Sequence, residues 1–184
     1  GSERIPRTGP VLIVSNHQSH LDPPLIGAGV PRTISYLARQ SLFRSRFFSG
    51  LIRSYGAIPL DLDGNPLPGL KESLRRLKCG DALLIFPEGT RTPHGELQPF
   101  ERGFTALARR SRAVIVPAAI EGAFRAWPRR RRFPRPGRVR VHFGSPLTPD
   151  DYRDWSEDRL VAETEARVKE CLNLLRLGSE IPPK

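Results

Sequence analysis

The sequence predicts an α/β fold: a single domain with a central, largely parallel or mixed sheet flanked by helices. Short apolar runs bounded by turn residues alternate with longer segments of helical periodicity, which is typical of parallel strands joined by helices. The chain has 184 residues, a length that fits one domain with its own core. All of its apolar runs are short, so we expect no segment that spans a bilayer.

The predicted strands cover residues 11–14, 33–38, 57–60, 82–86, 113–120 and 138–143. The predicted helices cover residues 23–29, 47–55, 68–78 and 103–110, with a long last one at 150–177. Thr148 and Asp150 are residue types that begin helices, which places the start of the last one there. Within 41–56, apolar residues recur at helical spacing among arginines. We favour a helix packed on the sheet over one that dips into lipid headgroups.

Positive charge is concentrated in one part of the chain. The net charge is +11, and 26 of the 30 basic residues are arginine. Residues 125–140 contain no acid and eight arginines: Arg125, Arg129, Arg130, Arg131, Arg132, Arg135, Arg138 and Arg140. Such a block attracts polyanions, which include nucleic acid, an anionic membrane surface and the phosphates of coenzyme A; the alternative is a solvated loop.

Of these polyanions, nucleic acid is the least favoured. Only Trp127 and Phe133 could stack on bases in this block, and no known nucleic-acid-binding motif is present. We therefore expect Arg129, Arg130, Arg131 and Arg132 to contact an anionic membrane surface or another polyanion such as the phosphates of coenzyme A.

The segment Asn16-His17-Gln18-Ser19-His20-Leu21-Asp22 lies where a predicted strand gives way to a predicted helix. Residues five apart do not face each other on a regular helix, but in a turn Asp22 can meet the imidazole of His17. A histidine oriented by a carboxylate is suited to be a general base, and α/β proteins bind substrates at the carboxyl ends of strands. Two simpler interpretations stay open, in which Asp22 is a helix N-cap and the histidines are ordinary loop residues. We predict no metal site, because no further ligand cluster completes one.

A second polar segment, Phe86-Pro87-Glu88-Gly89-Thr90-Arg91-Thr92, follows another apolar run. Gly89 allows the backbone to approach a ligand closely, while Glu88 and Arg91 offer an acceptor and a donor fork. These features predict a pocket for a hydroxylated, anionic substrate. The alternative is an ion pair between Glu88 and Arg91 that holds a loop. Two such segments after two strands favour one shared site.

With these segments the sequence resembles the glycerolipid acyltransferase family, best known for the lysophosphatidic acid acyltransferases. That family carries four blocks in a fixed order, and all four have counterparts here. The blocks match at Asn16, His17, Ser19 and Asp22 (N-H-x-S-x-x-D), in part at Gly56 to Leu62 (G-x-I-x-x-D-R), at Phe86 to Arg91 followed by Thr92 (F-P-E-G-T-R-S), and at Val114 to Pro117 (an apolar strand ending at proline). The blocks span residues 16–117, and their order makes the resemblance specific.

The resemblance implies a glycerol-phosphate-acyltransferase-like fold and an O-acyltransferase activity. His17 would take the proton from an acceptor hydroxyl, and Asp22 would fix the tautomer of His17. The hydroxyl oxygen would attack the thioester of acyl-CoA or acyl carrier protein, which is a co-substrate, so that no cofactor is bound. The expected acceptor is a lysophospholipid, namely lysophosphatidic acid, which gives phosphatidic acid. The alternatives are another lyso-acceptor such as an ornithine lipid, transacylation between phospholipids, and, more remotely, a non-enzymatic basic binding module.

The same comparison predicts which residues form the substrate site. They are Asn16, Ser19, Gly56, Glu88, Gly89, Thr90, Arg91 and Pro117. Ser19 would act by holding the turn through hydrogen bonds. The second block departs from the family pattern, because Leu62 stands where the family has an arginine thought to bind the acceptor phosphate, and Asp63 follows it. Either Arg91 or another arginine takes this role, the acceptor is not a simple glycerol phosphate, or the activity is reduced.

Residues 1–2, Gly-Ser in a chain without methionine, are interpreted as a cloning scar, and residues 3–184 as a single acyltransferase domain. We expect the protein to be peripheral on the cytoplasmic side of a membrane. A native membrane segment upstream of Gly1 is compatible with this interpretation.

Overall fold

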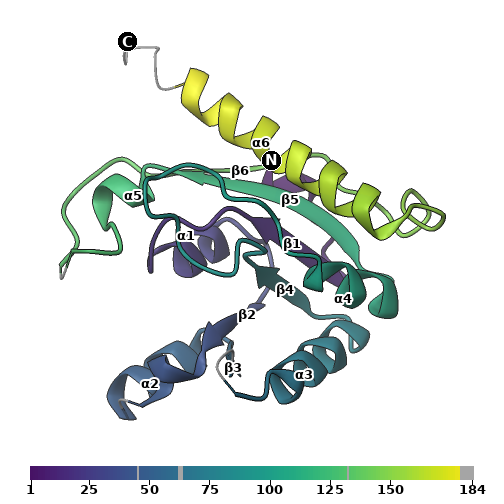
Figure 1. The fold of residues 1–184 in the computed structure, drawn as a ribbon, viewed down its shortest axis with the longest axis horizontal. Helices are drawn as coiled ribbons and strands as arrows, with labels where there is room; N and C mark the ends of the chain where they lie inside the picture. The colour runs from purple at the N-terminus through teal and green to yellow at the C-terminus, as the bar shows by residue number, and fades with distance from the viewer. Residues whose placement is uncertain (45, 62–63, 132, 179–184) are drawn as a thin grey trace.

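Six strands form one sheet. They are β1 (Val11–Ser15), β2 (Ile34–Arg39), β3 (Ala57–Leu60), β4 (Ala82–Ile85), β5 (Val114–Glu121) and β6 (Arg140–Phe143). The computed structural model describes residues 1–44, 46–61, 64–131 and 133–178. The order in the sheet is β3-β2-β4-β1-β5-β6, as Figure 1 shows. The first five strands are parallel, and β6 runs antiparallel to β5 at one edge.

The two central strands β1 and β4 are buried at every position. Val14 of β1 aligns with Ile85 of β4 on one side and with Pro117 of β5 on the other. Strands of a parallel sheet that is covered on both faces are continuously apolar rather than alternating. This explains why the sequence shows short apolar runs at these positions.

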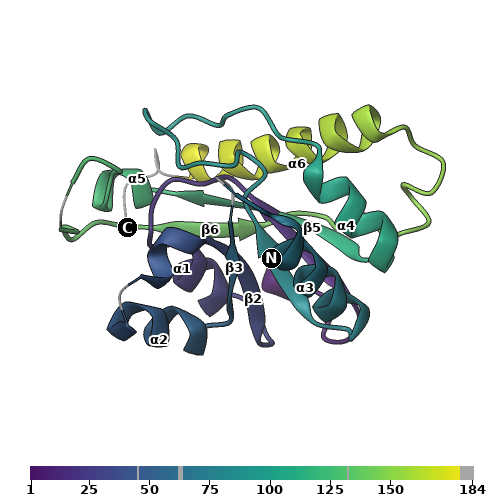
Figure 2. The same cartoon turned by 60° about the horizontal axis from the view of Figure 1, so that its bottom comes forward.

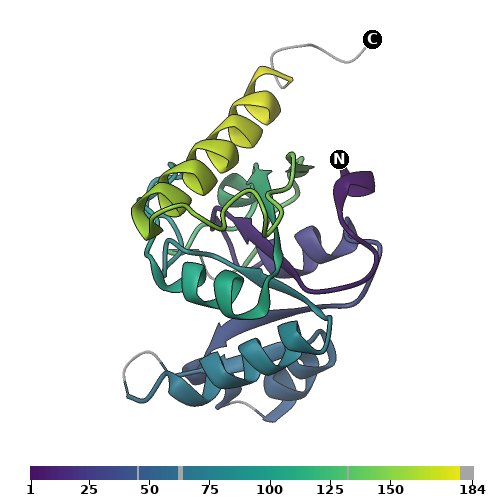
Figure 3. The same ribbon diagram turned by 90° about the vertical axis from the view of Figure 1, so that its right-hand side faces the viewer.

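Helices cover both faces of the sheet. They are α1 (Asp22–Ala28), α2 (Arg46–Ser54), α3 (Leu67–Lys78), α4 (Gly103–Ser111), the short α5 (Ala123–Ala126) and α6 (Glu157–Leu177), with 3₁₀ turns η1 (Ser2–Arg4) and η2 (Gln40–Phe43). Ile26 of α1 and Ile52 of α2 belong to the core on one face. Leu77 of α3, Leu107 of α4 and Leu160 of α6 belong to the core on the other face. Figure 3 shows α4 and α6 on the side of the sheet opposite to α1.

The structure confirms the six predicted strands and the five predicted helices, with one clear error at a boundary. The last helix begins at Glu157 rather than at residue 150, and Ser156 is its N-cap, accepting from the N–H of Arg159. Thr148 and Asp151 instead close a separate turn, in which the N–H and hydroxyl of Thr148 donate to the Asp151 carboxylate. The same residue types cap turns and helices alike, which explains the error.

The segment around residues 41–56 forms a helix that packs on the sheet, as predicted. Ile52 is buried in the core beside the strands, whereas Leu51 is 46% exposed. In the described part of the chain, no helix has the length and apolar character needed to cross a membrane.

Because β1 to β5 are parallel, their carboxyl ends share one edge of the sheet. The turn after β1 and the segment after β4 leave the sheet side by side there, since these two strands are neighbours. Figure 2 shows α1, α2 and α5 gathered at this end. The two polar segments singled out from the sequence are therefore brought together by topology alone.

Candidate active site

The side chains of His17 and Asp22 meet in the turn between β1 and α1. The Nδ1 atom of His17 lies 2.8 Å from Oδ2 of Asp22. His17 is 19% exposed at its side chain, whereas Asp22 is completely buried. Since Nδ1 faces the carboxylate, the second ring nitrogen, Nε2, remains available on the exposed side of the ring.

Asp22 holds the turn that carries His17. Its Oδ2 also accepts the N–H groups of Gln18, at 2.5 Å, and Ser19, at 2.7 Å. The N-cap interpretation of Asp22 is wrong, because Leu21 is the N-cap of α1 and Asp22 is the first helical residue. Its carboxylate points back to the preceding turn instead of forward along the helix. Oδ1 is buried and has no partner among the described residues.

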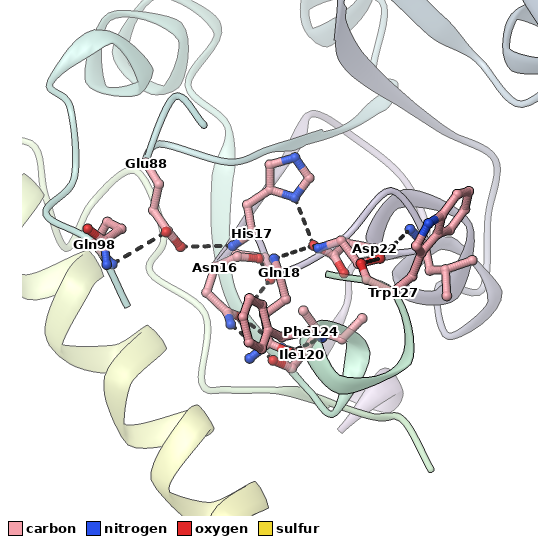
Figure 4. A network of polar contacts seen from close by, with 12 residues as sticks. Asn16, His17, Gln18, Asp22, Glu88, Gln98, Ile120, Phe124 and Trp127 are labelled. Carbon is pink, nitrogen blue, oxygen red and sulfur yellow. Dashed lines mark hydrogen bonds and ion pairs between the residues drawn. The ribbon is translucent and has the colours of Figure 1, made fainter. Parts of the chain in front are cut away.

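The backbone of His17 is held from the other side by the segment that follows β4. The N–H of His17 donates to Oε1 of Glu88 at 2.8 Å, and its carbonyl accepts from the N–H of Thr92 at 2.8 Å. The imidazole stacks on Phe86, with ring centroids 4.0 Å apart and an interplanar angle of 13°. Figure 4 shows Glu88 and Asp22 on either side of His17. One segment thus fixes both the main chain and the ring plane of His17.

The exposed side of His17 faces a cleft of about 450 Å³. The wall of this cleft is largely apolar and includes Leu37, Leu42, Ile52, Leu60 and Ile85. Clefts of this size with apolar walls and a few polar groups are typical of small-molecule sites.

Three arginines, Arg39, Arg91 and Arg129, also line the cleft. In the described ranges none of them forms an ion pair. Burial and the charge of Arg129 lower the pKa of Arg91, and Arg39 adds to this effect while Asp22 opposes it. Three neighbouring cations without a carboxylate partner make this part of the cleft suited to an anion.

A family model described as Acyltransferase matches residues 1–121. This range contains His17, Asp22 and every residue named above as lining the cleft except Arg129. The chain belongs to the acyltransferase family.

Curated relatives of this acyltransferase are about 30% identical to it. The 1-acyl-sn-glycerol-3-phosphate acyltransferase of Bacillus subtilis (strain 168) is 32% identical over 179 residues, which cover 94% of this chain and 86% of that protein. The enzyme of the same name from Pseudomonas aeruginosa is 31% identical over 173 residues, 92% of this chain and 64% of the relative. The chain therefore spans most of one relative and less than two thirds of the other.

The fold also matches a solved acyltransferase structure. The crystal structure of the 1-acyl-sn-glycerophosphate (LPA) acyltransferase PlsC from Thermotoga maritima superposes with a TM-score of 0.83 at 30% identity. The match covers 96% of this chain and 70% of that one.

Not all of the predicted substrate residues of this acyltransferase lie at the cleft. Gly89, Thr90 and Arg91 line it. Ser19 is buried and holds the turn as expected, since its hydroxyl donates to the carbonyl of Trp127 at 2.9 Å. Glu88 is 7% exposed, and both carboxylate oxygens accept backbone N–H groups, from His17 and Gln98. Glu88 therefore neither pairs with Arg91 nor lines the cleft.

Asn16 and Pro117, which the sequence predicts at the substrate site, lie away from the cleft and make contacts within the fold. The amide of Asn16 donates to the carbonyl of Ile120 at 3.0 Å and accepts from the N–H of Ile120 at 2.8 Å. Both its oxygen and its nitrogen thus bond to β5, and this ties the turn to that strand. Pro117 is buried in β5, where its carbonyl accepts from Gly144. Neither residue lines the cleft.

Gly56 lies at the wrong end of its strand for the predicted role. It precedes β3, at the amino edge of the sheet, about 13 Å from the carboxyl end by the rise of four strand residues. Its φ is +81°, and a Cβ atom there would lie 2.4 Å from the carbonyl oxygen of Ile34. Glycine is required here by backbone geometry rather than by a ligand.

The arginine-rich segment touches the cleft only at its beginning. Arg129 lines the cleft and donates to the hydroxyl of Thr90 at 3.4 Å, whereas Arg130 and Arg131 are exposed outside it. Arg132, and likewise Leu62 and Asp63 of the second family block, lie outside the described residues.

Sequence reasoning missed Arg39 and Tyr36, which line the cleft from β2. The sequence carried no signal for them, because only the strand order of the sheet places β2 beside β4, with Arg39 at its carboxyl end.

Helix α6 lies beyond the residues matched by the family model but reaches the same loops. Arg176 donates to the carboxylates of Glu121 at 3.1 Å and Glu96 at 3.2 Å, and to the carbonyl of Gly95 at 3.4 Å. The side-chain amide of Gln18, next to His17, lies 3.5 Å from two of the atoms that Arg176 contacts, the carbonyl oxygen of Gly95 and Oε2 of Glu121. One guanidinium therefore joins the end of β5 to the loop after Thr92.

We expect the free energy of unfolding to depend on pH because of Glu88. Burial raises its pKa from 4.5 to about 8, although the N–H groups of His17 and Gln98 act in the opposite direction. Unfolding between these pH values therefore releases a proton, and the free energy of unfolding should fall as pH rises, by at most about 1.4 kcal/mol per pH unit. Urea unfolding from pH 5 to pH 8 should show this decline in the wild type and lose it in Glu88→Gln. Glu101→Gln, at an exposed glutamate nearby, is the control. Equal slopes in all three proteins would contradict the assignment.

Proposed function

We propose that this acyltransferase moves an acyl group from a thioester to the free hydroxyl of a lysophospholipid, with His17 as general base. The observation that carries the proposal is the 2.8 Å contact between His17 and a fully buried Asp22. With Nδ1–H donated to Asp22, Nε2 keeps its lone pair and lines the cleft as the proton acceptor.

The proposed reaction balances through His17 alone. Nε2 takes the proton from the acceptor hydroxyl as its oxygen forms a bond to the thioester carbonyl carbon. The C–S bond then breaks, and the imidazolium returns the proton to the departing thiolate. The buried carboxylate of Asp22 stabilises the imidazolium that exists between these two transfers. No side chain of the protein needs to be acylated.

The proposed acceptor is lysophosphatidic acid, which yields phosphatidic acid. Arg39, Arg91 and Arg129 offer three cations for its phosphate, and they provide the positive charge that Leu62 does not. The apolar wall supplies room for hydrocarbon. The names of the Bacillus, Pseudomonas and Thermotoga relatives support the same acceptor. Acyl-CoA and acyl carrier protein both fit as donors, since each presents a thioester.

The proposed partner outside the cleft is an anionic membrane surface on the cytoplasmic side. Arg130, Arg131 and Arg135 are exposed, and Phe133 between them is 68% exposed. These residues belong to the basic loop, residues 129–135. A hydrogen bond from Trp127 Nε1 to the carbonyl of Arg131 holds the start of this loop. A fixed loop with guanidinium groups and an exposed aromatic ring suits the headgroup region of a bilayer. Arg129 joins this loop to the cleft, so the acceptor would enter from the membrane side.

Replacement of His17 tests the reaction. His17→Ala should lower kcat by ~10²–10⁴-fold, the usual contribution of general base catalysis. The measurement is release of free thiol from acyl-CoA in the presence of lysophosphatidic acid, lyso-ornithine lipid or monoacylglycerol. His94→Ala, at an exposed histidine outside the cleft, should leave kcat unchanged. Transfer by His17→Ala at the wild-type rate would refute the base assignment, and preference for lyso-ornithine lipid would refute the acceptor.

Replacement of Arg91 tests phosphate recognition. Arg91→Gln should raise KM for lysophosphatidic acid about 10- to 100-fold, because a hydrogen bond to a charged group contributes ~1.5–3 kcal/mol. For monoacylglycerol, which has no phosphate, KM should not change. Arg110→Gln, an exposed arginine at the far edge of the sheet, serves as the control. A similar rise in KM for both acceptors would show that Arg91 does not read the phosphate.

Vesicle binding tests the basic loop. Loss of two cations in Arg130→Gln/Arg131→Gln should weaken binding to phosphatidylglycerol vesicles about 10- to 30-fold, at ~1 kcal/mol for each residue. The same net charge is removed far from the cleft in Lys78→Gln/Arg110→Gln, which should bind like the wild type. Equal weakening in both pairs would mean that overall charge, not this loop, governs binding.

A further inference from the structure

Tyr36 is a polar residue in the mostly apolar wall of the cleft. It lies in β2, aligned with Ala57 of β3 and Leu84 of β4, and is 8% exposed. Its ring belongs to the core on the α1 and α2 face together with Ile52, and it lines the same cleft as His17.

The hydroxyl of Tyr36 has no hydrogen-bond partner in the described part of the chain. Across those residues, Oδ1 of Asp22 is the one fully enclosed side-chain polar atom that lacks a partner. The Tyr36 hydroxyl, also without a partner, is therefore at least partly exposed, and the residue that carries it lines the cleft. Tyrosine hydroxyls in largely buried surroundings normally have a hydrogen-bond partner, so this one has a donor free for a ligand in the cleft.

The chemistry of the cleft limits which ligand group can meet this hydroxyl. A hydrocarbon chain accepts no hydrogen bond, and a phosphate is drawn to Arg39, Arg91 and Arg129. The reacting hydroxyl belongs at His17. Among the strong acceptors next to the reacting hydroxyl, those that remain are the carbonyl oxygens of the acyl groups of the lysolipid and of the thioester. Burial raises the pKa of Tyr36, so its hydroxyl stays protonated and acts as a donor near neutral pH.

We infer that the Tyr36 hydroxyl donates a hydrogen bond to an acyl carbonyl oxygen of the bound substrates. This inference rests on the proposed function. The carbonyl belongs either to the ester of the acceptor or to the thioester of the donor, since both lie close to the reacting hydroxyl. If it is the acceptor ester, Tyr36 distinguishes ester-linked lysolipids from ether-linked ones.

The decisive comparison uses two acceptors and two matched variants. Tyr36→Phe removes only the hydroxyl oxygen, and Tyr55→Phe makes the same change at a tyrosine that is 59% exposed. The acceptors are 1-acyl lysophosphatidic acid and its 1-O-alkyl analogue of equal chain length, which lacks the carbonyl. Loss of one neutral hydrogen bond should lower kcat/KM of Tyr36→Phe about 3- to 10-fold on the ester. On the ether, wild type and Tyr36→Phe should be equal if the acceptor ester takes the bond, and should differ by the same factor if the thioester takes it. Tyr55→Phe should match the wild type throughout.

The outcomes separate the two carbonyls. A loss confined to the ester acceptor assigns the bond to the acceptor. An equal loss on both acceptors, with an unchanged thermal unfolding midpoint, assigns it to the thioester. Activity of Tyr36→Phe within twofold of wild type on both acceptors overturns the inference, as does an equal loss with a lowered midpoint.

Binding measured without a donor keeps this test apart from the proposed function. Titration calorimetry of the two lysolipids with wild type and Tyr36→Phe does not depend on turnover. If no acyl transfer occurs but Tyr36→Phe binds the ester more weakly than wild type does, the reaction is refuted and the acceptor carbonyl contact stands. If transfer occurs and Tyr36→Phe is unaltered on both acceptors, the reaction stands and the Tyr36 contact fails.

Discussion

The buried carboxylate of Asp22 holds both the turn that carries His17 and the orientation of its ring. Oδ2 of Asp22 accepts from two backbone N–H groups and faces the imidazole, although the residue has no exposed surface. A buried charge is costly unless strong hydrogen bonds offset its desolvation, and here three donors converge on one oxygen. Because Asp22 also opens α1, the N-terminal end of that helix favours its negative charge. The turn, the helix start and the histidine orientation therefore form one unit.

The parts of this unit that are close in sequence could be predicted. His17 and Asp22 are five residues apart, and one turn after a strand is enough to bring them together. The shared edge could be predicted as well, because the carboxyl ends of neighbouring parallel strands lie together. The meeting of His17 with Asp22 and the shared edge could both be predicted from local patterns, namely apolar runs followed by turn residues, which can be read directly from the sequence.

The rest depends on contacts between distant residues. Asn16 bonds to Ile120, 104 positions away, so nothing near Asn16 indicated that its amide was occupied. The family block that contains Gly56 ends at the carboxyl end of β3, near the site, but Gly56 itself lies at the amino end of this strand. Arg39 could not be assigned from β2 alone, since only the strand order places β2 beside β4. Strand order is a property of the assembled sheet, which periodicity along the chain does not encode.

The C-terminal helix sets the size of the smallest working unit. Leu160, Val168 and Leu172 of α6 are buried against the sheet, and Arg176 near its end holds the loops around His17. A fragment trimmed to residues 1–121 would keep every family block and still expose a broad apolar face to water. Chimeras that exchange the first 121 residues between relatives would also leave apolar surface badly covered. The relative that supplies these residues must supply α6 as well, or the α6 of the other relative must fit the same face of the sheet.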